Sequence, residues 1–139
     1  MIKKNRHHHL STWLKLCLFP LTLLTGCGLI NSTINKKFDT LTVKELADKL
    51  KKGDQIRIVD CRAENTFAES HIEGAVNIPI SKFDDSFMSI PKDKPVALIC
   101  YLGIFSRVGA QKLAENGYSE VYSVSGGMKA WESAHPDKP

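Results

Sequence analysis

One cysteine of this chain stands where a nucleophile would be useful. Cys100 follows the continuous apolar run 96–99 and precedes a segment with helical spacing over residues 106–116. An unbroken apolar run is typical of a strand buried on both faces of a parallel sheet. Open α/β folds bind their ligands at the carboxyl ends of such strands. Cys100 is therefore a candidate nucleophile, and the alternative is a buried structural cysteine.

The loop after Cys100 has the composition of an anion cradle. It can curl so that successive backbone N–H groups face the sulfur, and Gly103 can adopt the positive φ that the curve requires. The next helix would point the positive end of its dipole at the same place, which favours thiolate over thiol. The cradle would also suit a persulfide, an anion that is one sulfur longer. The residues expected to contribute their backbone are Tyr101, Leu102, Gly103, Ile104, Phe105 and Ser106.

Short strands and helices alternate around this loop. A capping box at Thr42 and Glu45 predicts a helix that ends near Gly53. Strands are expected over residues 56–60, 75–78, 95–101 and 121–124, and helices over 65–70, over 106–116 and from the glycines 126–127 through 131. This alternation predicts right-handed crossovers and an α/β sheet with helices packed on it.

The chain also carries a set of motifs that resembles the rhodanese domain. In chain order they are Val-Asp-Cys-Arg at 59–62, Phe67, His-Ile-Glu-Gly-Ala-Val-Asn-Ile-Pro at 71–79, Cys-Tyr-Leu-Gly at 100–103 with Ser106, and Gly-Gly-Met-Lys-Ala-Trp at 126–131. Each motif is weak alone, but together they span nearly all of residues 38–139.

The resemblance implies a fold and a reaction. The expected fold is a rhodanese-like, five-stranded parallel sheet flanked by helices on both faces. Cys100 would take a sulfane sulfur from thiosulfate, a persulfide or a polysulfide, become a persulfide, and pass the sulfur to cyanide or a thiol. The chain would thus be a rhodanese-type sulfurtransferase with no metal or organic cofactor, acting as a monomer on small sulfur compounds.

The flanking motif residues are expected to support the site. Asp60 and Arg62 match the family's Asp-x-Arg motif, and we expect a buried ion pair that braces the active-site loop. His71 is interpreted as a hydrogen-bonded structural histidine. The glycines 126–127 suggest a backbone turn, and Trp131 suggests core packing or a pocket wall.

The chain departs from the family at Phe105. Many members carry a cation there, where arginine can bind the sulfonate of thiosulfate. Such charge-assisted contacts contribute about 1.5 to 3 kcal/mol. We therefore expect a persulfide or polysulfide to be a better donor than thiosulfate. Arg107 would partly substitute if its side chain turned back over the rim; otherwise it is a solvated helix residue.

Three other hypotheses about the function of Cys100 and its domain stay open. Cysteine phosphatases that share the fold need arginine six residues after the cysteine, but Ser106 stands there and Arg107 follows. Some rhodanese-like domains are non-catalytic binding modules, although these usually lack the cysteine. The third reading is a disulfide between Cys61 and Cys100 that protects or switches off the nucleophile.

The N-terminus resembles a bacterial export signal with a lipid-attachment site. Residues 1–9 are cationic, residues 10–24 are mostly apolar, and Leu-Thr-Gly-Cys at 24–27 resembles a lipobox. We expect a signal peptide over 1–26, a tether over 27–37 acylated at Cys27, and the folded domain over 38–139. The protein would then be anchored by lipid to a membrane of the bacterial cell envelope, facing the periplasm or exterior. The alternative is an uncleaved membrane anchor that contains an ordinary cysteine.

The charge distribution agrees with this division. The formal net charge is +4, and four of the 19 basic residues lie in the first 26 positions, which hold no acidic residue. The remaining basic residues equal the 15 acidic ones in number. The body has no basic run that could follow a phosphate backbone, so nucleic acid is not expected as a partner.

Overall fold

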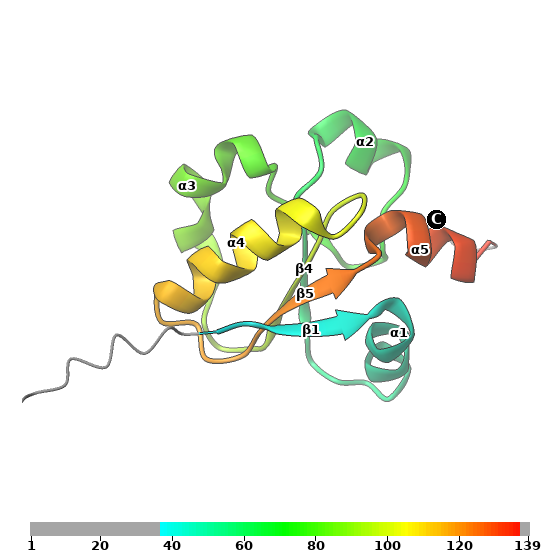
Figure 1. Ribbon diagram of the computed structural model, residues 1–139, viewed down its shortest axis with the longest axis horizontal. Coiled ribbons are helices and arrows are strands. Elements are labelled where there is room, and N and C mark those ends of the chain that lie inside the picture. Colours follow the sequence, from blue (N-terminus) through cyan, green and yellow to red (C-terminus); the bar gives the residue numbers. More distant parts are fainter. Residues whose placement is uncertain (1–36, 137–139) are drawn as a thin grey trace, which may run out of the picture. The chain divides into compact units, whose positions relative to one another are not determined.

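The protein is built on a five-stranded parallel sheet. The computed structural model describes residues 37–136. The strand order is β1-β5-β4-β2-β3, so β4 occupies the centre, as its apolar run predicts (Figure 1). The strands are β1 (Asp39–Thr42), β2 (Arg57–Asp60), β3 (Val76–Asn77), β4 (Val96–Ile99) and β5 (Val121–Ser125).

Five helices connect or follow the strands. They are α1 (Val43–Lys51), α2 (Glu64–Glu69), α3 (Phe83–Ser86), α4 (Ile104–Glu115) and α5 (Gly127–Ala134). Two short 3₁₀ turns, Ile80–Lys82 and Phe87–Ser89, flank α3. The predicted capping box is present, since Thr42 Oγ1 accepts from the Glu45 backbone N–H and Glu45 accepts from the Thr42 backbone N–H. It begins α1 as expected.

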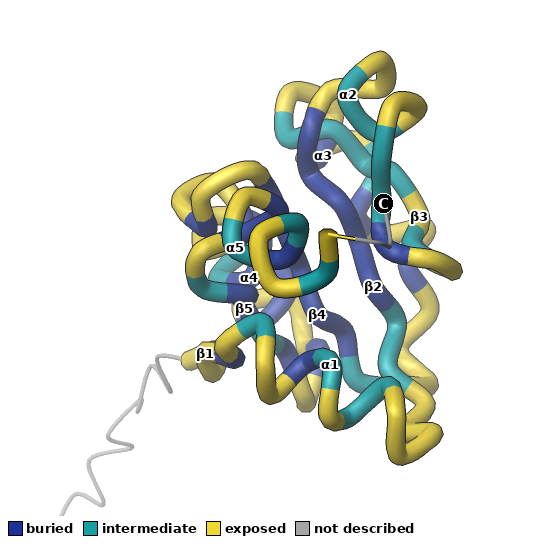
Figure 2. Tube along the Cα trace, turned by 90° about the vertical axis from the view of Figure 1, so that its right-hand side faces the viewer, coloured by how far each residue is buried: buried dark blue, intermediate teal, exposed yellow. Residues whose placement is uncertain are grey.

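The sheet separates two apolar layers. One layer lies under α3 and α4 and includes Leu98 and Leu113, whereas the other lies under α1 and α5 and includes Leu46 and Ile99. Alternate residues of β4 thus face opposite layers, and all of them are buried (Figure 2). Burying each such side chain contributes about 1.5 to 3 kcal/mol. The site residue that follows β4 is therefore carried by the most deeply packed element.

Three parts of the fold differ from the elements expected from the pattern. Strand β1 was not among them, because at this edge of the sheet only Leu41 is buried and the alternation is weak. Helix α3 and its 3₁₀ neighbours are also additional, and they are held by the buried side chains of Phe83 and Phe87. Helix α4 begins at Ile104 rather than at Ser106, so it includes part of the expected loop.

The predicted signal peptide and most of the tether, including Cys27, lie outside the described residues. Within residues 37–136, no helix is long and apolar enough to cross a bilayer.

Candidate functional site

Cys100 is the first residue after the central strand. Its side chain is nearly enclosed, with 3% of the residue exposed. The backbone N–H of Gly103 donates a hydrogen bond to Cys100 Sγ at 3.1 Å, and Ser106 Oγ lies 3.8 Å from the same sulfur. An N–H aimed at sulfur stabilises a negative charge there. This part of the predicted cradle is therefore formed.

Gly103 makes the turn that aims this N–H group. Its φ is +90°, the positive value that the sequence predicts, and it precedes the first residue of α4. A Cβ at this position would lie 2.9 Å from the Val124 carbonyl oxygen and 3.2 Å from the Gly126 nitrogen. The loop thus passes against the β5–α5 connection, and glycine is needed for both conformation and space.

The start of α5 fixes the other side of the loop. The N–H of Met128 donates to the Cys100 carbonyl at 2.8 Å, and the N–H of Lys129 donates to the Tyr101 carbonyl at 3.1 Å. These are two of the donors that a helix leaves free in its first turn. A Cβ on Gly127 would overlap the Cys100 carbonyl oxygen, so the sequence-predicted turn is also a close backbone contact with the nucleophile's own residue.

A hydrogen-bonded pair of buried serines lies beside Cys100. Ser106 is fully buried, and its Oγ lies 2.9 Å from Ser123 Oγ of β5. Ser106 was expected to contribute its backbone, but in the structure its side chain approaches the sulfur. Ser123 was missed. The available signal was a polar residue two positions after Val121, on the inward-facing side of a buried strand.

Asp60 and Arg62 form the expected buried ion pair. Arg62 Nη2 lies 2.7 Å from Asp60 Oδ2, with 6% and 0% of their side chains exposed. Arg62 also donates to the carbonyl of Ser70, and Asn77 Nδ2 donates to the carbonyls of Asp60 and Arg62. Among the described residues no hydrogen bond joins the pair to residues 100–106. The pair directly holds the segments around α2, and Ser70 Oγ donates from there to Glu132 of α5.

The residues that follow Cys100 leave a mostly apolar surface exposed. Four loop residues have about half or more of their surface exposed: Tyr101 54%, Leu102 49%, Ile104 63% and Phe105 57%. Arg107 is exposed too, but it lines a separate hollow with Phe83 and Asp84 of α3, and none of residues 100–106 lines that hollow. The side-chain cation that would meet an anionic donor is not supplied by the loop.

A second buried thiol lies at the carboxyl end of the neighbouring strand, β2. Cys61 follows β2 and is buried, and both Cys61 and Cys100 are free thiols in this structure. Burial raises the pKa of Cys61, and the negative charges that Cys100 and Asp60 can carry raise it further. Cys61 is therefore held as a neutral thiol.

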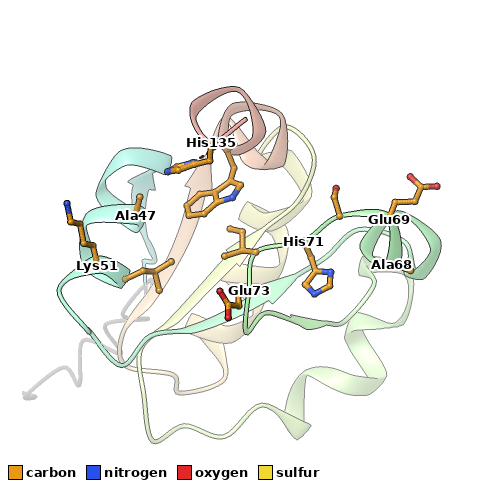
Figure 3. A pocket seen from close by; sticks show the side chains of 11 residues that line it. Ala47, Lys51, Ala68, Glu69, His71, Glu73 and His135 are labelled. Atoms are coloured by element: carbon orange, nitrogen blue, oxygen red, sulfur yellow. Dashed lines mark hydrogen bonds between the residues drawn. The ribbon is translucent and has the colours of Figure 1, made fainter. Parts of the chain in front are cut away.

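A second hollow, about 1020 Å³ in volume, opens between α1, α5 and the segment from α2 to β3. Figure 3 shows Ala47 and Lys51 on one side of it, His71 and Glu73 on another, and His135 directly after the end of α5. Trp131 forms part of its wall, as expected. His71 bonds the Phe67 carbonyl through Nδ1 at 2.9 Å and stacks on the Phe67 ring, which fits the structural role predicted for it.

Comparison with known proteins agrees with this geometry. Residues 42–134 match the model of the rhodanese-like domain. A thiosulfate sulfurtransferase GlpE of Coxiella burnetii is 39% identical over 92 residues, which cover 66% of this chain and 85% of that protein.

Solved structures show the same fold. A rhodanese-like domain protein from Staphylococcus aureus superposes with a TM-score of 0.63 at 31% identity, covering 68% of this chain and 91% of that one. The reduced CoADR-RHD of Bacillus anthracis gives a TM-score of 0.65 at 31% identity, covering 73% of this chain but only 18% of that longer chain. With its motifs, its sheet and its cysteine loop in agreement, the chain belongs to the rhodanese-like domain family.

Proposed function

We propose that the protein is a sulfurtransferase that moves a sulfane sulfur from a donor to a thiol or cyanide through a persulfide on Cys100. One observation carries the proposal: the thiol of Cys100 ends the central strand and receives the Gly103 N–H at 3.1 Å. Relatives named thiosulfate sulfurtransferase support this class of reaction. The matched region includes Cys100 and its loop.

The reaction has two displacement steps. In the first, Cys100 thiolate attacks the sulfane sulfur of the donor, an S–S bond forms, and the remainder of the donor leaves with the electron pair of the broken bond. In the second, an acceptor thiolate or cyanide attacks the outer sulfur and Cys100 leaves as thiolate. The Gly103 N–H stabilises negative charge on Cys100 Sγ at the start and the end of this cycle.

The exposed apolar residues after Cys100 support a prediction about the preferred donor. Leu102, Ile104 and Phe105 follow Cys100 along the chain and are exposed, whereas Cys100 itself is nearly buried. A sulfonate has no side-chain cation in this loop to replace its water, whereas the organic part of a persulfide can pack against apolar surface. We therefore propose organic persulfides or polysulfides as preferred donors, with thiosulfate used less efficiently.

The test is a mass spectrum of the full-length protein after exposure to thiosulfate and, separately, to a polysulfide. We expect a gain of one sulfur that maps to Cys100 and is lost on adding a thiol acceptor, and no such gain in Cys100→Ser. Absence of the added sulfur with both donors would contradict sulfur transfer and favour a binding module.

We also propose that the protein is a lipoprotein of the bacterial cell envelope. The support is the order of cationic stretch, apolar run and Leu-Thr-Gly-Cys at 24–27. Signal cleavage before Cys27 and acylation of its thiol would leave residues 27–37 as the lipidated tether.

The matched test is Cys27→Ser beside Cys17→Ser in cells fed a labelled fatty acid. Cys17 is the control because it lies inside the predicted signal and is removed with it. We expect label and membrane fractionation in wild type and Cys17→Ser, and loss of both in Cys27→Ser. Equal labelling of all three would show that Cys27 is not the lipid site.

A further inference from the structure

The register of the sheet places two thiols side by side. Asp60 of β2 pairs with Ile99 of β4, and the backbone N–H of Cys61 donates to the Ile99 carbonyl at 2.7 Å. This hydrogen bond continues the parallel ladder, so Cys61 and Cys100 are the next facing pair. Neighbouring strands lie about 4.8 Å apart. Disulfides join Cα atoms about 4.4 to 6.8 Å apart, so this pair is within range of a bond.

The two thiols also face the same apolar layer. Val59 and Leu98 form a register pair two residues earlier, and both belong to the layer under α3 and α4. Side chains alternate with a period of two along a strand, so Cys61 and Cys100 return to that face. Both residues lie in that layer, with 2% and 3% exposed. Cys61 is therefore more accessible to Cys100 than to a thiol in solution.

Cys61 takes no part in the two-step transfer described above. It nevertheless lies beside the sulfur to which the transferred atom is attached. We propose that Cys61 discharges the Cys100 persulfide inside the molecule when no acceptor arrives, releasing sulfide and leaving a Cys61–Cys100 disulfide. This inference rests on the proposed persulfide chemistry of Cys100.

The step balances in atoms and electrons. Cys61 Sγ bonds to Cys100 Sγ, and the bond between Cys100 Sγ and the outer sulfur breaks. The outer sulfur leaves with that electron pair and takes the thiol proton of Cys61, so a persulfide anion yields the disulfide and HS⁻. The Cys61 thiol sulfur is oxidised to the disulfide level and the outer sulfur is reduced to sulfide, while Cys100 Sγ exchanges one S–S bond for another. A dithiol or two monothiols from solution then restore the cysteines by thiol–disulfide exchange.

Burial determines the pace of this step. Desolvation raises the pKa of Cys61, so the residue is held as a thiol and must give up its proton as the outer sulfur departs. An external thiolate has no such requirement and attacks first when it is present. Internal discharge is thus a slow alternative that yields one sulfide for each loaded protein and then closes the site until it is reduced.

The experiment uses the full-length chain with Cys17→Ser and Cys27→Ser, so that Cys61 and Cys100 are the remaining thiols. The protein is loaded with polysulfide, freed of donor, and followed for sulfide release and by tryptic mapping without reductant. Trypsin separates the cysteines, because the peptide 58–62 ends at Arg62 and the peptide with Cys100 ends at Arg107. Cys61→Ala and Cys61→Ser are the test variants, with thermal unfolding to establish that each folds.

We expect the loaded protein to release sulfide as the two peptides become linked, and the persulfide to last at least ten times longer in folded Cys61 variants. Equal lifetimes in all three proteins would overturn the inference and leave sulfur transfer intact. A folded Cys61→Ala protein that never gains sulfur would remove the proposed function and this inference with it.

Discussion

Phe105 is the residue that we expect to limit the use of an anionic donor. Phe105 is 57% exposed in the first turn of α4, the helix that follows the Cys100 loop. In Phe105→Arg, a guanidinium would supply a charge-assisted contact to the sulfonate of thiosulfate, about 1.5 to 3 kcal/mol. We expect kcat/KM for thiosulfate to rise about tenfold or more, since about 1.4 kcal/mol is a factor of ten.

Val108→Arg is the matched control, because Val108 is 60% exposed on the same helix but lines the separate hollow beside α3. Steady-state kinetics with thiosulfate and with an organic persulfide would show whether the gain is specific to the anion. Equal gains in both variants would mean that general attraction, rather than a contact at position 105, is responsible.

The Asp60–Arg62 pair gives a second residue-scale prediction. Removing one member of a buried ion pair leaves an uncompensated charge, which costs about 3 to 5 kcal/mol. Asp60→Ala is therefore expected to lower the free energy of unfolding by this amount, measured by urea denaturation. Asp93→Ala is the control: Asp93 is 58% exposed in its 3.1 Å ion pair with Arg57, and we expect a loss of about 1 kcal/mol or less. Similar losses would contradict the burial argument.

Sequence reasoning found the residues whose roles depend on type and local spacing. Cys100, the turn at Gly103 and the Asp60–Arg62 pair could be predicted because each is defined within a few positions of the chain. Ser123 could not be linked to Cys100 in this way, since its contact with Ser106 joins β5 to α4. The same holds for Gly127, whose approach to the Cys100 carbonyl depends on how α5 meets the loop.

At the scale of elements, the amino end of α5 and the cysteine loop form one backbone unit. Gly127 has φ +58°, and a Cβ there would overlap the carbonyl oxygens of Cys100 and Tyr101. Gly127→Ala should push α5 from the loop, weaken the Met128 and Lys129 hydrogen bonds, and lower kcat/KM about tenfold or more, as expected when reacting groups are misplaced.

Gly53→Ala is the control for backbone strain alone. Gly53 also has a positive φ, +83°, but a Cβ there meets nothing within 4 Å. We expect it to lower the unfolding temperature without changing kcat/KM of the folded protein. Loss of activity in both variants would mean that strain, rather than the contact with the loop, is the cause.

The helices and strands that have a clear pattern of buried residues or a capping motif could be predicted, and those without one could not. Strand β4 and helix α1 carry strong signals, an unbroken apolar run and a capping box, and both formed where expected. Strand β1 has one buried residue of four and gave no alternation to detect. Helix α3 has four residues, too few for a helical period.

For the folded unit as a whole, we expect Cys61 to make the free energy of unfolding depend on pH in the alkaline range. Its reference pKa is 9.0, and burial raises the folded value well above that. Above about pH 9 the unfolded chain loses this proton while the folded chain keeps it, so the free energy of unfolding falls as pH rises. The limiting slope for one proton is about 1.4 kcal/mol per pH unit.

We expect the wild type to lose about 1 kcal/mol relative to Cys61→Ala between pH 9 and pH 10, measured by urea unfolding in the presence of reductant. Tyr118, whose pKa burial also raises, is present in both proteins, so its contribution cancels in the difference. A constant difference across this range would show that the folded thiol ionises as freely as the unfolded one.

The parallel sheet also fixes where the chain enters relative to the nucleophile. Residue 38 leads into the amino end of β1, whereas Cys100 lies at the carboxyl end of β4, and parallel strands place these at opposite edges (Figure 1). The chain therefore enters the domain at the edge of the sheet opposite the reactive sulfur. The point of entry and the reactive sulfur thus occupy different edges of the sheet, so a dissolved sulfur donor can approach Cys100 from the edge that the entering chain does not use.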